Sequence, residues 1–274
     1  MNLSSRIIVF LSVVIAFLFP SPMEGKKRND RDIKHFKLSE NRDTLLKYTG
    51  SKALIDLTAY PQLNELKVIG RSAFESNQKI KEIILPPHLK EIGKSAFSYC
   101  RNLRKISIPN SVEEIGSSAF WDCDSLYLDH LPSSLKRINE NTFVGCRKLC
   151  ITEIPESVAD IDIRAFAHCD NLRSIRLPSK LKTIPAVIFF RCKNLENVVI
   201  PDSVNRIEQN AFYGCESLKE LKLPQGECTI IGDPFDKCTN LTRILISPST
   251  TAIEYNGPLG IEMVDLDAEI FQRY

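Results

Sequence analysis

The sequence predicts a solenoid of stacked repeats, built mainly from β-structure, and three periodic features predict it. The chain has 274 residues and repeats itself every 23 residues, without an insertion that breaks the register. A proline, a phenylalanine and a cysteine each recur at this interval. The prolines are Pro86, Pro109, Pro132, Pro155, Pro178, Pro201 and Pro224; the phenylalanines are Phe74, Phe97, Phe120, Phe143, Phe166, Phe189, Phe212 and Phe235; the cysteines are Cys100, Cys123, Cys146, Cys169, Cys192, Cys215 and Cys238.

Two rows of aliphatic side chains keep the same period. One 23-residue unit cannot bury its apolar edge alone, so its stability must come from stacking on its neighbours. The period lies within the range of leucine-rich repeats, which predicts a leucine-rich-repeat solenoid of the right-handed β/α superhelix type, with about eight turns over residues 63–253. The rows are Ile69, Ile92, Ile115, Ile138, Ile161, Ile184, Ile207 and Ile230, and Ile80, Leu103, Leu126, Leu149, Leu172, Leu195, Leu218 and Leu241.

Each repeat is expected to contain one short strand. Ile106 and Ile108 alternate with Lys105 and Ser107, as a half-buried strand requires. Pro109 ends this strand, because proline cannot donate a hydrogen bond to a sheet.

A short helical or 3-10 turn is expected where Ala-Phe-x-x-Cys follows in each repeat. The residue before this motif is a good helix N-cap in six of eight turns, and Pro234 suits the first position of such a turn. The phenylalanine is expected to fill the interior. The residues before the motif are Ser72, Ser95, Ser118, Asn141, Arg164, Val187, Asn210 and Asp233.

The unit from Ile108 to Cys123 resembles the BspA-type leucine-rich repeats, and the resemblance covers about residues 63–253. Residues 36–39 and 45–50 resemble the hairpin-like segment that often caps such arrays. The resemblance implies a surface-exposed or secreted protein of a bacterium or protozoan parasite. It also implies adhesion to host matrix proteins or to other cells, a role that a fold alone does not establish.

The N-terminus has the build of a secretory signal peptide. Arg6 precedes an almost unbroken apolar run over residues 7–19, which is too short to span a bilayer. We expect a signal peptide over residues 1–25, a lead and capping segment over residues 26–62, and a C-terminal cap over residues 254–274. No later segment is apolar and long enough to cross a membrane, so the mature chain is expected to be secreted or held at an extracellular surface.

Charge and motifs argue against nucleic-acid binding and catalysis. The chain has 36 basic and 34 acidic residues without a basic tract, so we expect no nucleic-acid partner. His35, His88, His130 and His168 occupy unrelated positions, and no nucleophile, phosphate-loop or metal motif occurs. We therefore expect no enzyme, cofactor or metal, and the sequence specifies no oligomeric state.

Seven of the nine cysteines occupy one equivalent position per turn. We expect a column of buried free thiols rather than disulfides, because pairing a uniform ladder would distort alternate turns. Cys150 and Cys228 lie three turns apart, well beyond disulfide reach. Cys150 is expected to be partly exposed.

Two turns break the strand pattern, because the inward position of Ile106 becomes Asp129 and then Thr152. Leu128 and Ile151 stand one residue earlier. We expect a local bulge or register shift, and a functional notch in the array is the alternative.

The outward strand positions mix charged and apolar residues, which favours a protein-binding face over a merely solvated one. Trp121 and Tyr213, at equivalent positions after the phenylalanine, form a rival surface that equally suits local packing. The ligand-binding candidates are Lys105, Tyr127, His130, Arg173, Arg176, Lys222, Leu245, Trp121 and Tyr213.

The sequence therefore predicts a secreted or cell-surface binding module that adheres to or recognises a protein ligand, such as a host matrix or cell-surface protein. A structural surface protein that assembles with itself is the alternative. An enzyme is the distant alternative, with His130 and Glu153 on adjacent strands as an acid–base pair.

Overall fold

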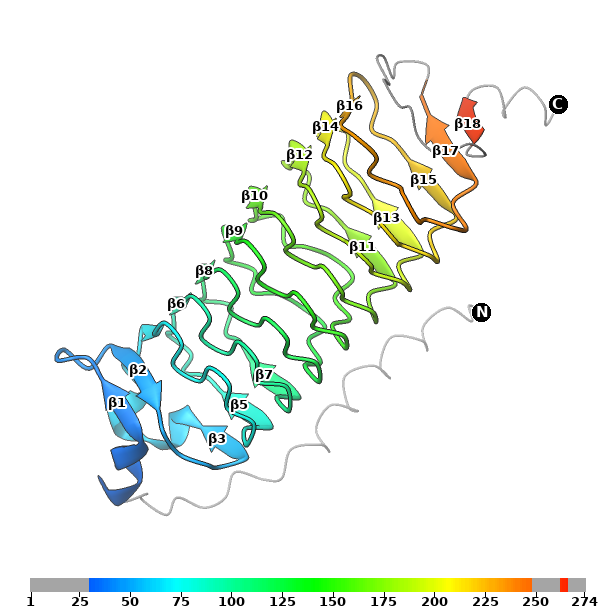
Figure 1. The fold of residues 1–274 in the computed structure, drawn as a ribbon. Helices are drawn as coiled ribbons and strands as arrows, with labels where there is room; N and C mark the ends of the chain where they lie inside the picture. Colours follow the sequence, from blue (N-terminus) through cyan, green and yellow to red (C-terminus); the bar gives the residue numbers. More distant parts are fainter. Residues whose placement is uncertain (1–29, 248–261, 266–274) are drawn as a thin grey trace, which may run out of the picture. The chain divides into compact units, whose positions relative to one another are not determined.

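The computed structural model describes residues 30–247 and 262–265. Nearly all of them belong to one compact unit, residues 34–274. This unit is a β-solenoid of about nine turns, which confirms the predicted fold class. Consecutive turns stack side by side along one axis (Figure 1). The expected signal peptide lies outside the described residues, and so does most of the expected C-terminal cap.

One side of the solenoid carries a column of strands that we call the main column. It contains the strand expected at Lys105–Ser107, and its strands pair in parallel in three separate sheets. The sheets are β3 (Leu54–Asp56), β5 (Glu82–Ile84) and β7 (Lys105–Ser107); β11 (Ser174–Arg176) and β13 (Asn197–Val199); and β15 (Glu220–Lys222), β17 (Arg243–Ile246) and β18 (Glu262–Asp265).

A second column of two-residue strands, the return column, runs where each turn doubles back. The sequence predicted only one strand per repeat. The isoleucine row supplies the buried residue of each return strand, and its neighbour stays half-buried or exposed. These strands are β4 (Val68–Ile69), β6 (Glu91–Ile92), β8 (Glu114–Ile115), β9 (Arg137–Ile138), β10 (Asp160–Ile161), β12 (Thr183–Ile184), β14 (Arg206–Ile207) and β16 (Thr229–Ile230).

An antiparallel hairpin of β1 (Phe36–Leu38) and β2 (Thr44–Tyr48) precedes the first turn, where the sequence suggested a hairpin-like cap. Its aromatic residues continue the core. The ring of Tyr48 lies 4.9 Å from Phe36 and 5.4 Å from Phe74, measured between centroids. Three 3-10 helices complete this region: η1 (Asp30–His35), η2 (Leu57–Ala59) and η3 (Pro61–Leu63).

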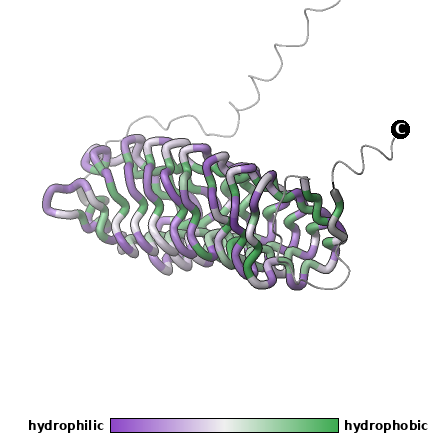
Figure 2. The backbone as a smooth tube through the Cα atoms, turned by 90° about the horizontal axis from the view of Figure 1, so that it is seen from above, coloured by the Kyte–Doolittle hydropathy of each residue, from purple (hydrophilic) through white to green (hydrophobic). Residues whose placement is uncertain are grey.

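The core is a continuous ladder of the repeated phenylalanines. Neighbouring rings are stacked, as for Phe120 and Phe143, whose centroids lie 5.5 Å apart with planes 2° from parallel. All eight phenylalanines of the ladder are fully buried. Figure 2 shows that stretches of similar hydropathy recur at the same place in consecutive turns and form bands along the stack. A phenylalanine thus fills the same interior position in eight consecutive turns.

The repeated cysteines are free and buried, as the sequence predicted. Each thiol donates a hydrogen bond to the carbonyl oxygen of the phenylalanine one turn earlier, over 3.0–3.2 Å. Burial raises the pKa of the Cys100 and Cys192 thiols to about 12. These two thiols are therefore protonated at neutral pH, and they serve packing and hydrogen bonding.

The Ala-Phe-x-x-Cys segments are turns, and the expected helix N-caps are wrong. Ser118, before the motif, has a φ of 58°, and Asp122, before the cysteine, has a φ of 54°. An N-cap residue needs a backbone in the β region, which a left-handed residue does not have. The N–H groups of Ser118, Phe120 and Asp122 bond instead to carbonyl oxygens of the next turn, over 2.7–2.9 Å. The N–H groups of Trp121 and Cys123 bond within the turn, to the carbonyl oxygens of Ser118 and Phe120, so bonds between turns alternate with local bonds along the segment.

The last turn shows the same arrangement with one change. The left-handed residue before its motif is Gly232 rather than Asp233. Pro234 restricts the backbone of the residue before it, which accounts for the displacement by one position.

Candidate ligand-binding surface

The outward side chains of the main column form one exposed face. Lys105, Arg176 and Lys222 are exposed on it, as the sequence predicted. Ile84 and Val199 are also exposed, at 37% and 39% of their surface. Parallel register places Arg176 beside Val199. Cationic and apolar side chains therefore lie together on a rigid support of paired strands.

Leu245 does not belong to this exposed face, although the repeat register placed it there. It is only 9% exposed, whereas Lys222, its neighbour in register, is exposed. Strand β17 buries both Ile244 and Leu245, so it departs from the alternation of the other strands. The strand that pairs with it, β18, follows in place of another repeat. Leu245 is thus unsuited to direct contact with a ligand.

His130 and Arg173 are exposed, but both have acidic partners. His130 Nδ1 lies 2.6 Å from Asp129 Oδ1, so its close carboxylate is the adjacent residue rather than Glu153. The backbone of Glu153 forms an isolated parallel β-bridge with that of Arg176. Arg173 donates to Glu196 Oε1 in the next turn over 2.6 Å. The ion pair neutralises Arg173, and neither residue stands out as a charged anchor.

The main column is interrupted between β7 and β11, where the sequence predicted a bulge or register shift. Leu128 and Ile151 point inward and are buried, at 4% and 1% exposed. The N–H of Tyr127 bonds to Arg104 one full repeat earlier, but the N–H of Cys150 bonds to Leu128, one residue out of that register. The shift is therefore confirmed, and it separates two sheets of the column.

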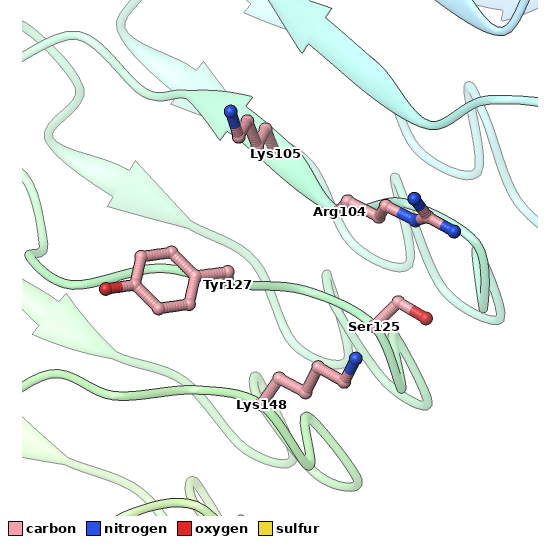
Figure 3. A pocket seen from close by; sticks show the side chains of 5 residues that line it. All are labelled: Arg104, Lys105, Ser125, Tyr127 and Lys148. Atoms are coloured by element: carbon pink, nitrogen blue, oxygen red, sulfur yellow. The ribbon is translucent and has the colours of Figure 1, made fainter. Parts of the chain in front are cut away.

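A shallow depression of about 430 Å³ lies beside this interruption. Its lining comes from three consecutive turns, as Figure 3 shows: Arg104 and Lys105 from the first, Ser125 and Tyr127 from the second, and Lys148 from the third. Tyr127 is 54% exposed. The structure thus brings together two predicted candidates, Lys105 and Tyr127, with Arg104 from the adjacent row.

Ser125 and Lys148 were missed by sequence reasoning, although the repeat contains a signal for them. In other turns an asparagine occupies their position and donates its side-chain amide to a carbonyl of the preceding turn. Asn102, Asn194 and Asn240 do so, over 2.6–2.9 Å. Ser125 and Lys148 replace this asparagine in the two turns that lose the main strand, but Lys79 and Ser217 replace it in turns that keep β5 and β15. The signal for the site is therefore the shifted strand of these two turns, not the residue type.

Tyr127 and Cys150 interact at the border of the depression. A hydrogen bond with Cys150 raises the pKa of the Tyr127 phenol. Burial raises the pKa of the Cys150 thiol, which is half-buried as predicted. Cys150 and Cys228 are both free. At neutral pH both the phenol and the thiol are protonated, so Tyr127 offers a ring and a neutral hydroxyl.

The rival surface on the turns consists of aromatic residues that pack on each other. Trp121 lies 6.0 Å from Tyr99, and Tyr213 lies 4.7 Å from Phe190, between stacked ring centroids. All four are half-buried. A ring whose face is covered by its neighbour offers less area to a ligand, which favours the packing interpretation for this row.

Among residues 30–247 and 262–265, no group of three or more His, Cys, Asp or Glu side chains could hold a metal ion. Within the same part of the chain, no helix is long and apolar enough to cross a membrane.

Comparison with known proteins identifies the repeat. Among curated proteins, none matches this sequence. The structure is similar to that of a leucine-rich repeat protein from T. pallidum, with 24% identity, a TM-score of 0.62, and 84% of this chain and 98% of that chain covered. It is also similar to a leucine-rich repeat protein from Bacteroides ovatus, with 24% identity, a TM-score of 0.52, and 85% and 77% covered.

These structures share the fold, and the sequence itself gives the family. The sequence pattern of the BspA type leucine rich repeat region matches in six copies, over residues 54–170 and 136–257. Because this pattern covers more than half of the chain, the chain belongs to the BspA-type leucine-rich repeat family.

Proposed function

We propose that this chain is a secreted or cell-surface binding module that recognises a protein ligand through the exposed face of its main column. The observation that carries the proposal is the composition of this face. Exposed Val199 and Ile84 accompany the cations Arg176 and Lys222 on paired strands, and exposed Tyr127 lies at the interruption of the column. Aromatic, aliphatic and arginine side chains on a rigid support are the usual anchors of protein interfaces.

Two further observations support the proposal. Leucine-rich repeat proteins commonly bind proteins, and this chain belongs to a family of such repeats. The apolar run over residues 7–19 has the build of a secretory signal, which would bring the face to the outside of the cell. Adhesion to a host matrix or cell-surface protein is the role we assign to the face.

The test measures binding of the full chain to purified extracellular-matrix proteins and cell-surface ectodomains, one at a time. A saturable partner is expected. The combined substitution Arg176→Ala, Val199→Ser and Lys222→Ala should weaken that binding at least ~10-fold and leave the melting transition nearly unchanged, because outward side chains contribute little to stacking.

Trp121→Ala and Tyr213→Ala, measured in the same way, provide the comparison for the rival surface. Loss of binding with these two variants alone would move the site to the turns. Self-association at high molecular weight without any saturable partner would favour a structural role and contradict the proposal.

A further inference from the structure

The three cations that line the depression form no ion pair with a described carboxylate, in contrast to some other cations of the same rows. Arg173 directly precedes strand β11, as Arg104 directly precedes β7. It pairs with Glu196 over 2.6 Å. Arg243, in the row of Lys105, pairs with Glu220 over 2.9 Å. Among the described residues, no ion pair joins Arg104, Lys105 or Lys148 to a carboxylate. Parallel register sets Lys105 beside Glu82, which offsets part of its charge. The depression still gathers three cations on one surface.

The charge of Arg104 works against the stability of the stack. Lys81 and Arg104 occupy equivalent positions in consecutive turns, and the N–H of Arg104 bonds to the carbonyl of Lys81 over 2.7 Å. Both residues directly precede paired strands, β5 and β7, where like charges opposite each other are destabilising. Lys148 stands where the asparagines of other turns donate to the preceding turn, a bond that it does not provide in their way. Three cations that gather on one depression without an ion pair to a described carboxylate indicate a site for a ligand of opposite charge.

We propose that the depression lined by Arg104, Lys105, Ser125, Tyr127 and Lys148 binds the carboxylate side chains of an acidic segment on the protein ligand. This inference rests on the proposed function and names the part of the ligand that anchors it. The planar guanidinium of Arg104 suits a carboxylate, which it can bind through two parallel hydrogen bonds. Lys105 and Lys148 add point charges from the first and third turns.

The remaining lining suits a peptide. Ser125 offers a hydroxyl between the two lysine-bearing turns, and Lys148 directs its amine toward Ser125 (Figure 3). Tyr127 presents an exposed ring on which the aliphatic part of a glutamate side chain can pack. A depression of about 430 Å³ accommodates side chains.

A short acidic segment fits better than a long polyanionic glycan. The unneutralised charge is confined to three turns, and carboxylates border it. Asp124, next to Ser125, holds Arg101 and Arg147 at 3.9 and 3.4 Å. Asp129 follows Tyr127 two residues later and holds His130. An extended polyanion would have to pass these carboxylates, whereas a few glutamates or aspartates would not.

The experiment uses the full chain and a short fluorescein-labelled peptide rich in glutamate, with a glutamine-for-glutamate version as the comparison. Fluorescence anisotropy at about 50 mM salt, where screening is weak, measures the dissociation constants. The glutamate peptide should bind and the glutamine peptide should not. The combined substitution Arg104→Gln, Lys105→Gln and Lys148→Gln should weaken binding at least ~10-fold, because close charge pairs are lost.

A matched control removes the same number of charges elsewhere. Lys94→Gln, Lys136→Gln and Lys182→Gln replace exposed lysines outside the depression and its rows, and should change binding less than ~2-fold. The single charge reversal Lys148→Glu gives a second, less extensive variant if the triple variant folds poorly. It should also weaken binding of the glutamate peptide.

Three outcomes of the peptide assay would overturn the inference. The first is absence of binding to the glutamate peptide, and the second is an equal loss in the control variant, which would mean that only net charge matters. The third is tighter, Arg104-dependent binding of a heparin-derived oligosaccharide, which would make this a sulfate site. Because the peptide assay needs no protein ligand, its result is separate from that of the ligand panel. A panel protein that binds the triple variant undiminished would leave the proposed function intact and contradict this inference.

Discussion

The Cys146 thiol donates a hydrogen bond of 3.1 Å to the carbonyl oxygen of Phe120 in the preceding turn. The same bond recurs in every turn of the column, and each thiol adds a second hydrogen bond to a carbonyl that already accepts from a backbone N–H, as Phe120 does from Cys123. A typical intramolecular hydrogen bond contributes about 0.5–1.5 kcal/mol. A disulfide would remove the S–H donors from two turns at once. The cysteines therefore stabilise the stack in their reduced form.

The first prediction follows for the thiols in solution. Mass spectrometry of the chain unfolded in the presence of an alkylating agent should find most of the column cysteines modified, hence free. Several disulfides within the column would contradict the hydrogen-bonded arrangement. The cysteines concerned are Cys100, Cys123, Cys146, Cys169, Cys192, Cys215 and Cys238.

The second prediction concerns alkaline pH. Burial raises the pKa of Cys100 and Cys192 to about 12, so the folded chain keeps their protons when the unfolded chain loses them near pH 9. The stability from each such thiol is complete below about pH 9. It is lost as pH rises toward 12, by about 1.4 kcal/mol per pH unit and thiol.

Urea unfolding from pH 7 to pH 10 measures this loss. The free energy of unfolding should fall steeply above about pH 9, and Cys192→Ala should make the slope shallower by about one proton. A free energy of unfolding that stays constant to pH 10 would show that the thiols are not buried.

The third prediction tests the core. Phe143 stacks between Phe120 and Phe166, with both centroid distances at 5.5 Å. Phe143→Ala should lower the free energy of unfolding by ~3–5 kcal/mol, because it leaves a cavity in the ladder. Lys105→Ala, on the exposed face, should change it by less than about 0.5 kcal/mol. Similar effects of the two changes would refute the assignment of inward and outward positions.

The fourth prediction tests the left-handed turn residues. Val187 has a φ of 62°, which is strained for a β-branched side chain, whereas Asn141 and Asn210 hold the same position with a φ of 57°. Val187→Asn should raise the free energy of unfolding by about 0.5–1 kcal/mol, because asparagine tolerates this backbone. Asn210→Val is the reciprocal control and should lower it. Thermal unfolding of both variants measures these changes. A destabilised Val187→Asn variant would contradict the strain assigned to the Val187 backbone.

The sequence by itself determined the stack, the phenylalanine core and the thiol column. In a solenoid with an unbroken period, every residue at one repeat position meets the same neighbours in each turn. Its burial and contacts can therefore be predicted from its position in the repeat. Phe143 and Cys146 could be placed for this reason. The shift at Leu128 and Ile151 was also readable, because the inward aliphatic moves by one residue.

Only the tertiary structure decided the rest, because the determining partners lie outside the repeat unit. Ser118 resembles an N-cap locally, but its N–H group bonds to Glu140 in the next turn, and this bond selects the left-handed backbone. Leu245 is outward by register yet buried in β17, which pairs with β18 rather than with another repeat. Lys148 lies with Arg104 and Lys105 because three consecutive turns line one depression beside the interrupted strands. Their grouping depends on distances across turns, which a single repeat does not encode.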